Sequence, residues 1–219
     1  MRKIAEISIE NEEFELLPER CLFRKKTRTL LAADLHWGKA EVFQKHGIAL
    51  PSNVLDDDLA RLDQAIAETN PETPLILGDL IHAPMGVTPS VIERVARWRD
   101  SHPEMKFQLI RGNHDRQHRW PIEWKLEDLG TQLTDGDFLF THDEPVRPVE
   151  QFVWAGHFHP AVKLGNGSDS LKLPCFTIQL NGKRGLLPAF SAFTGGANIA
   201  PRTRSERVFA ITETAVIEV

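Results

Sequence analysis

The stretch FVWAGHFH, residues 152–159, decides the architecture that we expect, because an apolar run ends abruptly in two histidines one residue apart. A continuous apolar run of this kind is typical of a buried β-strand. Side chains two residues apart in extended chain project to the same side, so we expect His157 and His159 to aim at one point while Phe158 turns toward the core. Two convergent imidazoles indicate a metal site, and two packed or surface histidines are the alternative.

Four other short apolar runs end in the same way. The polar side chains that follow them are Asp34 and His36, Asp79 and His82, Asn113 and His114, and His142. Ligands of open α/β sheets bind beyond the carboxyl ends of the strands, and helical patterns separate the runs in the first half of this chain. One shared site explains five such endings better than five separate coincidences.

The composition is that of an ordinary globular protein, with 219 residues, a formal net charge of -5 and no tyrosine. This length is ample for a buried core, and no linker or repeat divides the sequence, so we expect a single domain over residues 1–219. Cys21 and Cys175 are the only cysteines, which favours a reducing cytoplasm over a disulfide framework. The sequence shows no signal peptide and no apolar run of bilayer length, so we expect no membrane contact.

Alternation and turn residues outline the remaining elements. Strands are expected at residues 4–9, 14–17, 21–23, 29–33, 74–77, 106–110, 137–141, 175–180 and 208–219. One helix is expected after Asn53 and a second from Thr88 and Pro89, each with an apolar face. Residues 121–129 are expected to form a short helix stopped by Gly130, whereas residues 37–50 have a mixed pattern.

The candidate ligands are carboxylates, imidazoles and one amide. Mixed oxygen and nitrogen sets suit Mn, Fe, Zn, Ni or Co better than Ca or Mg. Their number exceeds what one tetrahedral ion needs, so we expect two divalent ions bridged by a carboxylate. Two ions about 3.5–4 Å apart lower the pKa of a bound water, which makes hydroxide available near neutral pH, and they neutralise charge on a phosphoryl group.

The motifs Asp-x-His, Gly-Asp-x-x-His, Gly-Asn-His-Asp, His and Gly-His-x-His, in this order from Asp34 to His159, resemble the calcineurin-like metallophosphoesterase superfamily. The resemblance implies an α/β fold, a four-layered αββα sandwich of two mixed β-sheets flanked by helices. It implies two metal sites that share Asp79. One site would be held by Asp34, His36, Asp79 and His159, and the other by Asp79, Asn113, His142 and His157. It also implies that the catalytic residue His114 contacts the substrate phosphate and protonates the leaving oxygen.

A narrower resemblance, to the bacterial DNA-ligase-associated metallophosphoesterases, rests on four stretches. These are AADLHWGKA (32–40), HGIALP (46–51), LILGDLIH (75–82) and IRGNHD (110–115). It implies a manganese-dependent phosphodiesterase, a DNA endonuclease of DNA repair that is associated with a DNA ligase and a helicase. The implied partner is DNA that is single-stranded or flexible.

His82 departs from the superfamily pattern, in which an aspartate at this place pairs with the catalytic histidine. An imidazole cannot supply the same negative charge, so the acid role of His114 is less secure here. His82 could instead be a donor to the substrate, a partner behind the metal ligands, or a structural residue, and the sequence leaves these three roles open.

The substrate is less well defined than the chemistry. Arg116 and Arg119 are candidates to bind substrate phosphates, together with Asn113 and His82, and Trp120 could stack a base; a solvated loop with Trp120 packed down is the alternative. Further basic residues that could form a positive track for DNA are Lys183, Arg184, Arg202, Arg204 and Arg207. The competing functions are a phosphatase or pyrophosphatase for a nucleotide or another small metabolite, and a metal-free binding scaffold, against which the filled ligand positions argue.

Overall fold

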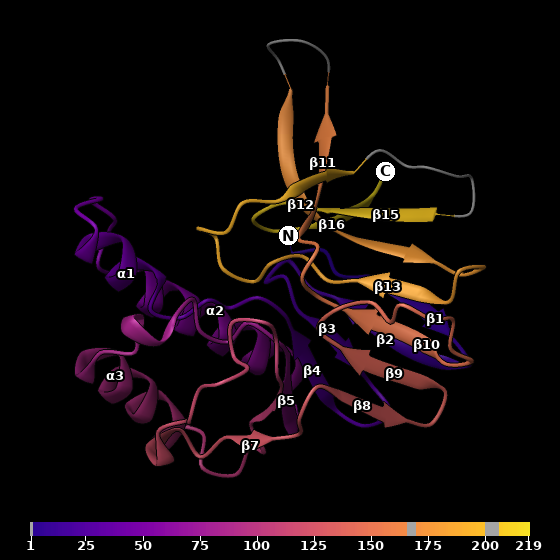
Figure 1. Ribbon diagram of the computed structural model, residues 1–219. Coiled ribbons are helices and arrows are strands. Elements are labelled where there is room, and N and C mark those ends of the chain that lie inside the picture. The colour runs from indigo at the N-terminus through magenta and orange to yellow at the C-terminus, as the bar shows by residue number, and fades with distance from the viewer. Residues whose placement is uncertain (1, 166–169, 200–205) are drawn as a thin grey trace.

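Two mixed β-sheets form the centre of the protein, in a computed structural model that describes residues 2–165, 170–199 and 206–219 (Figure 1). The first sheet has seven strands in the order β1-β2-β3-β4-β5-β6-β7. They are β1 (Ala5–Ile9), β2 (Glu12–Leu16), β3 (Leu22–Arg24), β4 (Thr29–Ala32), β5 (Thr73–Leu77), β6 (Gln108–Ile110) and β7 (Glu127–Asp128). β1 to β4 form an antiparallel meander, whereas β4 to β7 run parallel.

The second sheet has nine strands in the order β14-β11-β12-β13-β10-β9-β8, with β15 joining β12 to β16. They are β8 (Gln132–Asp135), β9 (Phe138–Thr141), β10 (Phe152–Ala155), β11 (Pro160–Leu164), β12 (Leu171–Gln179), β13 (Arg184–Leu186), β14 (Ala197–Ile199), β15 (Glu206–Ile211) and β16 (Val216–Glu218). β9 and β10 run parallel, so their carboxyl ends lie at one edge, as those of β4, β5 and β6 do in the first sheet.

The helices connect the parallel strands of the first sheet. α1 (Lys39–Lys45) and α2 (Val54–Thr69) lie between β4 and β5, and η1 (Pro84–Gly86) and α3 (Pro89–Asp100) lie between β5 and β6. A 3-10 turn, η2 (Ile122–Trp124), precedes β7. The expected start of α3 is confirmed, because the Thr88 hydroxyl accepts a hydrogen bond from the Val91 N–H at 3.3 Å and Pro89 is the first helical residue.

Two apolar layers hold these elements together. The first packs the buried faces of α2 and α3, through Leu59, Leu62 and Val95, against the outer face of the first sheet. The second lies between the sheets, where Phe14 of β2 packs edge-on against Phe138 of β9 with ring centroids 5.2 Å apart. Strands β5, β9 and β10 bury side chains on both of their faces. Their sequences are therefore continuous apolar runs.

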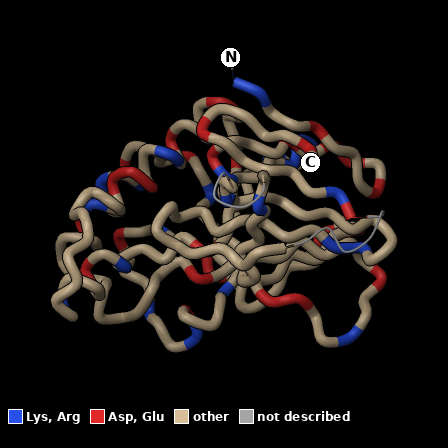
Figure 2. The backbone as a smooth tube through the Cα atoms, turned by 90° about the horizontal axis from the view of Figure 1, so that it is seen from above, with Lys and Arg blue, Asp and Glu red and all other residues tan. Residues whose placement is uncertain are grey.

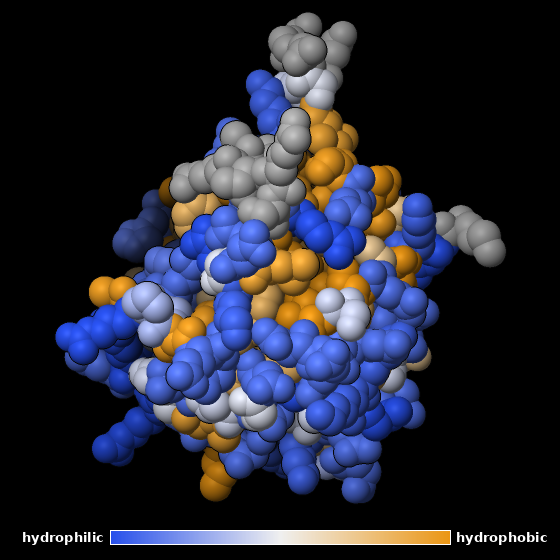
Figure 3. Space-filling view, turned by 90° about the vertical axis from the view of Figure 1, so that its right-hand side faces the viewer, coloured by the Kyte–Doolittle hydropathy of each residue, from blue (hydrophilic) through white to orange (hydrophobic). Residues whose placement is uncertain are grey.

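The expected class, two mixed sheets with helices, is confirmed. All α-helices of the described residues precede Ser101, and α2 and α3 pack on the first sheet. On the side away from the helices, an area of apolar side chains reaches the surface and polar side chains surround it (Figure 3). Of the described helices, none is both long and apolar enough to span a bilayer.

Residues 37–50, where the sequence has a mixed pattern, contain α1, which has only two buried residues, Ala40 and Val42, and so leaves no periodic pattern in the sequence. One local prediction was wrong. Residues 121–129 form only the turn η2 before the chain pairs with β6 as β7, a long-range contact that no local pattern reveals.

Candidate metal centre

The polar clusters after β4, β5, β6, β9 and β10 meet at one edge of the two sheets. The backbone joins them directly, since the Asp34 N–H donates to the Gly78 carbonyl at 3.1 Å and the Gly156 N–H donates to the His142 carbonyl at 3.1 Å. Gly78 is required there, because a Cβ at this position would overlap the imidazole of His142. The structure thus brings together the side chains predicted to hold metal.

Left-handed backbone presents most of these side chains. The φ angles are 58° at Asp34, 50° at His36, 49° at Asp79, 61° at His157 and 50° at His159. Non-glycine residues rarely adopt this conformation, which costs about 1–2 kcal/mol per residue. The extended geometry predicted for His157 and His159 was therefore wrong, and the two imidazoles enter two different clusters.

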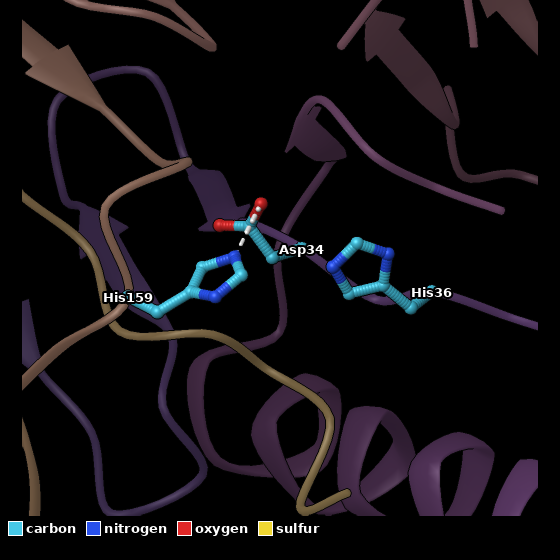
Figure 4. A group of neighbouring side chains, drawn as sticks. All are labelled: Asp34, His36 and His159. Atoms are coloured by element: carbon cyan, nitrogen blue, oxygen red, sulfur yellow. Dashed lines mark ion pairs between the residues drawn. The ribbon is translucent and has the colours of Figure 1, made fainter. Parts of the chain in front are cut away.

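The first cluster consists of Asp34, His36 and His159. Figure 4 shows the imidazoles of His36 and His159 on opposite sides of the Asp34 carboxylate. His159 Nε2 lies 3.0 Å from Asp34 Oδ1. Neither atom makes a well-formed hydrogen bond within the described residues, and the same is true of His36 Nδ1, although all three atoms are buried. Buried polar atoms without partners are unfavourable, so a cation among them fits this cluster.

The second cluster surrounds Nε2 of His142. This atom lies 3.4 Å from Asp79 Oδ2, 3.0 Å from Asn113 Oδ1 and 3.1 Å from His157 Nδ1. The other ring nitrogen, Nδ1, donates to the Leu77 carbonyl at 3.0 Å, which leaves Nε2 free to bind a metal ion. Burial lowers the pKa of His142, but its contacts with Asp79 and Asp34 outweigh burial and raise the pKa to about 9. The position therefore favours positive charge, from a proton or from a metal ion.

Asp79 links the clusters. It shares one group of neighbouring ligand atoms with His36 and His114, and another with His142 and His157. Burial raises its pKa, but contacts with His142 and the His114 N–H lower the pKa to about 2, so the carboxylate is ionised. Burial lowers the pKa of His36 to about 3, so this imidazole is neutral at physiological pH and able to coordinate.

His114 lies beside the clusters, with its side chain 36% exposed and Nε2 3.8 Å from Asp79 Oδ2. Its Nδ1 donates to the backbone carbonyl of His82 at 2.6 Å. The carbonyl of His82 thus occupies the acceptor role that an aspartate would have. The His82 ring stacks on that of His114 with centroids 5.6 Å apart, and burial, followed by the charge of Lys39, lowers its pKa.

Sequence reasoning missed Asp115, which fixes the loops that carry the ligands. Its fully buried carboxylate accepts hydrogen bonds from the N–H groups of Leu80 at 3.2 Å, Ile81 at 3.3 Å and Gly112 at 3.0 Å. Burial raises its pKa above the ordinary value. Aspartate is a common turn former, and Asp115 ends the motif Gly-Asn-His-Asp, so the sequence contained two local signals for the role.

Lys39 was also missed. Lys39 is the first residue of α1, and its Nζ lies 3.2 Å from the Thr194 hydroxyl. The ammonium group is close enough to His36 and His82 for its charge to act on both imidazoles. Burial lowers its pKa. Within the described residues Lys39 forms no ion pair, so it adds uncompensated positive charge to the rim of the centre.

The loop after Asn113 differs from the expected substrate arm. Arg116 and Arg119 are exposed and make no side-chain contact with either cluster in the part of the chain that the structure describes. Trp120 is partly buried against Trp124, with centroids 6.2 Å apart, and its Nε1 donates to Asp128 at 3.2 Å. Trp120 is therefore packed down and unavailable for stacking on a base.

Among the residues that the structure describes, the predicted basic track of the C-terminal region is not continuous, because each of its described members lies beside a carboxylate. Lys183 lies 3.6 Å from Glu10, Arg184 pairs with Glu144 at 3.1 Å, and Arg207 pairs with Glu218 at 2.7 Å. Arg202 and Arg204 lie outside the described residues. Figure 2 shows the same mixing over the whole backbone, with Lys and Arg interspersed among Asp and Glu.

Comparisons with known proteins agree with this geometry. The family model of the calcineurin-like phosphoesterases matches residues 27–170. The crystal structure of the Pseudomonas putida nuclease MPE superposes with a TM-score of 0.85 and 32% identity, over 99% of this chain and 100% of that one. Yfce, a phosphoesterase from E. coli, gives a TM-score of 0.41 and 16% identity, over 87% of this chain and 97% of that one.

No curated protein matches the sequence significantly. The family match spans more than half of the chain and contains the strand ends that build both clusters. The fold, the ligand types and their positions all agree with it. The chain is thus a hydrolase of phosphoester bonds that belongs to the calcineurin-like phosphoesterase family.

Proposed function

We propose that the two clusters hold two divalent metal ions that share Asp79. The proposed ligands are Asp34, His36, Asp79 and His159 for one ion, and Asp79, Asn113, His142 and His157 for the other. The observation that carries the proposal is the set of buried ligand atoms without hydrogen-bond partners in the first cluster, next to a carboxylate that belongs to two groups. Mixed carboxylate and imidazole ligands favour manganese, and iron, zinc, nickel or cobalt also suit them.

Two such ions, when bound, supply a water of lowered pKa and stabilise charge on the phosphoryl group. Residues of the chain balance charge, orient the imidazoles and donate the proton. Asp34 and Asp79 balance the charge of the ions, and the carbonyls of Leu77 and His82 orient His142 and His114. His114, held by its Nδ1, keeps Nε2 beside the centre, 3.8 Å from Asp79 Oδ2, where it can donate a proton to the leaving oxygen.

The proposed substrate is a phosphodiester of DNA, and the proposed activity is that of an endonuclease in DNA repair. The likeness to the Pseudomonas putida nuclease over almost the whole chain supports this, as does the open position of His114 and His157, which are 36% and 52% exposed. Association with a DNA ligase and a helicase in the cytoplasm is part of the same proposal. Both cysteines are free and buried, as suits a reducing compartment.

Substitution of the shared carboxylate tests the proposal. Asp79→Asn is expected to lower the metal content from two ions to fewer than one per chain and to abolish hydrolysis, because one change weakens both sites. The measurements are elemental analysis and manganese-dependent cleavage of single-stranded DNA, duplex DNA and nitrophenyl esters. Asp57→Asn, on the exposed face of α2, is the control. Two ions retained in Asp79→Asn would exclude the bridge, and hydrolysis of monoesters without DNA cleavage would instead support a metabolite phosphatase.

A further inference from the structure

A hollow of about 280 Å³ lies beside His159, between the loop that precedes β14 and strand β12. Two cations, Arg20 and Lys172, line it together with small residues, and the described residues contribute no carboxylate to its wall. Four other hollows of similar or larger volume each combine cations with carboxylates. The hollow next to the metal centre therefore differs from these four in the sign of its charge, and its two cations also line one of the four, which contains Glu19 and Glu213.

In the described part of the chain, neither of the two cations that line this hollow forms an ion pair with a carboxylate. Within the described residues, the Arg20 guanidinium makes three hydrogen bonds, at 3.3, 3.3 and 3.0 Å, to backbone carbonyls of residues 189–191, all through Nη1. The nearby carboxylate of Asp58 interacts electrostatically with Arg20, but this carboxylate accepts a hydrogen bond from Arg61 at 3.0 Å. The donors Nε and Nη2 of Arg20 thus remain for a ligand.

Lys172 lies on β12 opposite Lys163 of β11, so the two lysines share one face of this antiparallel pair. Like charges placed directly opposite one another are unfavourable in a sheet. Lys172 donates to the Gly196 carbonyl at 2.5 Å, and neither lysine pairs with a carboxylate in the described part of the chain. An anion between them would remove the repulsion.

Two exposed phenylalanines are next in sequence to His159 and Thr194, which line the hollow. Phe158, between the proposed ligands His157 and His159, is 45% exposed, and Phe193 is 41% exposed. The prediction that Phe158 turns toward the core was therefore wrong. The loop that carries Phe193 is fixed against the centre, because the Ala197 N–H donates to the His159 carbonyl at 2.8 Å. Exposed aromatic rings beside unpaired cations are the arrangement with which proteins bind single-stranded nucleic acid.

We propose that Arg20, Lys163, Lys172, Phe158 and Phe193 form a platform for the strand of single-stranded DNA that leads away from the scissile phosphate. Its phosphates bind the three cations and its bases stack on the two rings. Lys39 extends the positive charge toward the metal centre through Thr194, which lines the hollow. The inference rests on the proposed nuclease function and places the strand on the His159 side of the centre, rather than on the loop of Arg116 and Arg119.

Binding measurements test the platform without hydrolysis. The probe is a short fluorescein-labelled oligothymidylate with phosphorothioate linkages, and fluorescence anisotropy gives its Kd on the manganese-loaded protein. Phe158→Ala and Phe193→Ala are each expected to raise Kd by roughly 5- to 150-fold, the usual worth of one stacked base. Leu180→Ala, which removes an apolar side chain that is 47% exposed in the turn before β13, is the matched control.

Charge reversal tests the cations. Lys172→Glu and Lys163→Glu are each expected to lower the slope of log Kd against log salt by roughly 0.7, the value for one phosphate contact on a single strand. Lys106→Glu, an exposed lysine at the opposite ends of the strands, is the control. Equal Kd values and equal slopes in platform and control variants would overturn the platform.

Hydrolysis of a nitrophenyl phosphodiester separates this result from a failure of the proposed function. A small diester reaches the metal centre alone, so the platform variants should lose much more activity on DNA than on the small diester. Equal losses on both substrates would place these residues in the support of the metal centre and refute the platform. A native protein that cleaves the small diester but not DNA would refute the nuclease function, whatever the binding data show.

Discussion

Backbone conformation at single residues determines what this site can bind. Five of the proposed ligands are non-glycine residues with positive φ, and each conformation costs about 1–2 kcal/mol. The neighbouring strands over-determine these conformations, since the His36 N–H donates to the Asp79 carbonyl at 2.9 Å and the His157 N–H donates to Asp34 Oδ2 at 3.0 Å. The bond from the His157 N–H therefore also orients the Asp34 carboxylate.

His114 is expected to act on the substrate and to bind no metal ion. His114→Ala should keep both ions and lose about 10²–10⁴-fold in rate on DNA, because the leaving oxygen then lacks its proton donor. The loss should shrink for a nitrophenolate leaving group, which needs no proton. The measurement is kcat on DNA and on a nitrophenyl diester, with His46→Ala, an exposed histidine at the end of α1, as control.

The hydrogen bond from His114 to the His82 carbonyl leads to a second expectation. The acceptor is the backbone carbonyl, which His82→Ala retains, so this variant should lose far less activity than His114→Ala. A loss as large as that of His114→Ala would show that the His82 imidazole itself contacts the substrate. Equal losses on good and poor leaving groups in His114→Ala would instead assign His114 to phosphate binding.

At the level of elements, the strand ends were predictable and the way they present ligands was not. An apolar run that stops at Asp34, Asp79 or His142 is a local pattern, and the structure places β4, β5 and β9 there. The left-handed turns that follow depend on bonds between strands far apart in sequence, so extended geometry was the only local expectation. For the same reason the exposure of the platform residue Phe158 escaped prediction, whereas α1 escaped it because only two of its residues are buried.

Helix α2 carries a buried acid whose titration should be visible in stability. Burial, opposed by Arg61, raises the pKa of Asp58 to about 6, whereas the unfolded value is about 3.9. Between about pH 4 and pH 6 the folded state therefore holds more protons than the unfolded state, and stability falls as the pH rises through this range. Two pH units correspond to a change on the order of 2–3 kcal/mol.

Asp58→Asn should remove this slope, because the amide does not titrate. The measurement is the free energy of unfolding in urea from pH 4 to pH 7, taken as the difference between variant and native protein so that other titrating groups cancel. Asp57→Asn, one residue earlier on the exposed face of α2, should leave the slope in place. Identical slopes in native protein and Asp58→Asn would show that Asp58 has an ordinary pKa.

At the scale of the whole molecule, the metal centre joins the two sheets. Asp34, Asp79 and Asn113 follow strands of the first sheet, whereas His142 and His157 follow strands of the second. The layer between the sheets is apolar, and beyond it the loops of the two sheets meet at the edge through hydrogen bonds such as that from the His157 N–H to Asp34 Oδ2. Bound ions would add cross-links between the sheets at this edge.

Removal of metal should lower the melting temperature as well as the activity. A ligand at about 100 times its Kd stabilises the folded state by about 2.7 kcal/mol, which corresponds to roughly 5–11 °C for a chain of this size. Chelation of the manganese-loaded protein should lower the melting temperature by about this amount, and added manganese should restore the original value.

The loss of amide protection in hydrogen exchange should concentrate at the loops after β4, β5, β9 and β10, because these carry the proposed ligands, while β2 and β3 stay protected. Asp79→Asn, which weakens both sites, should show little further shift of the melting temperature on chelation. A melting temperature that is the same with and without manganese would mean that the apolar layers alone hold the sheets together and that the ions serve catalysis only.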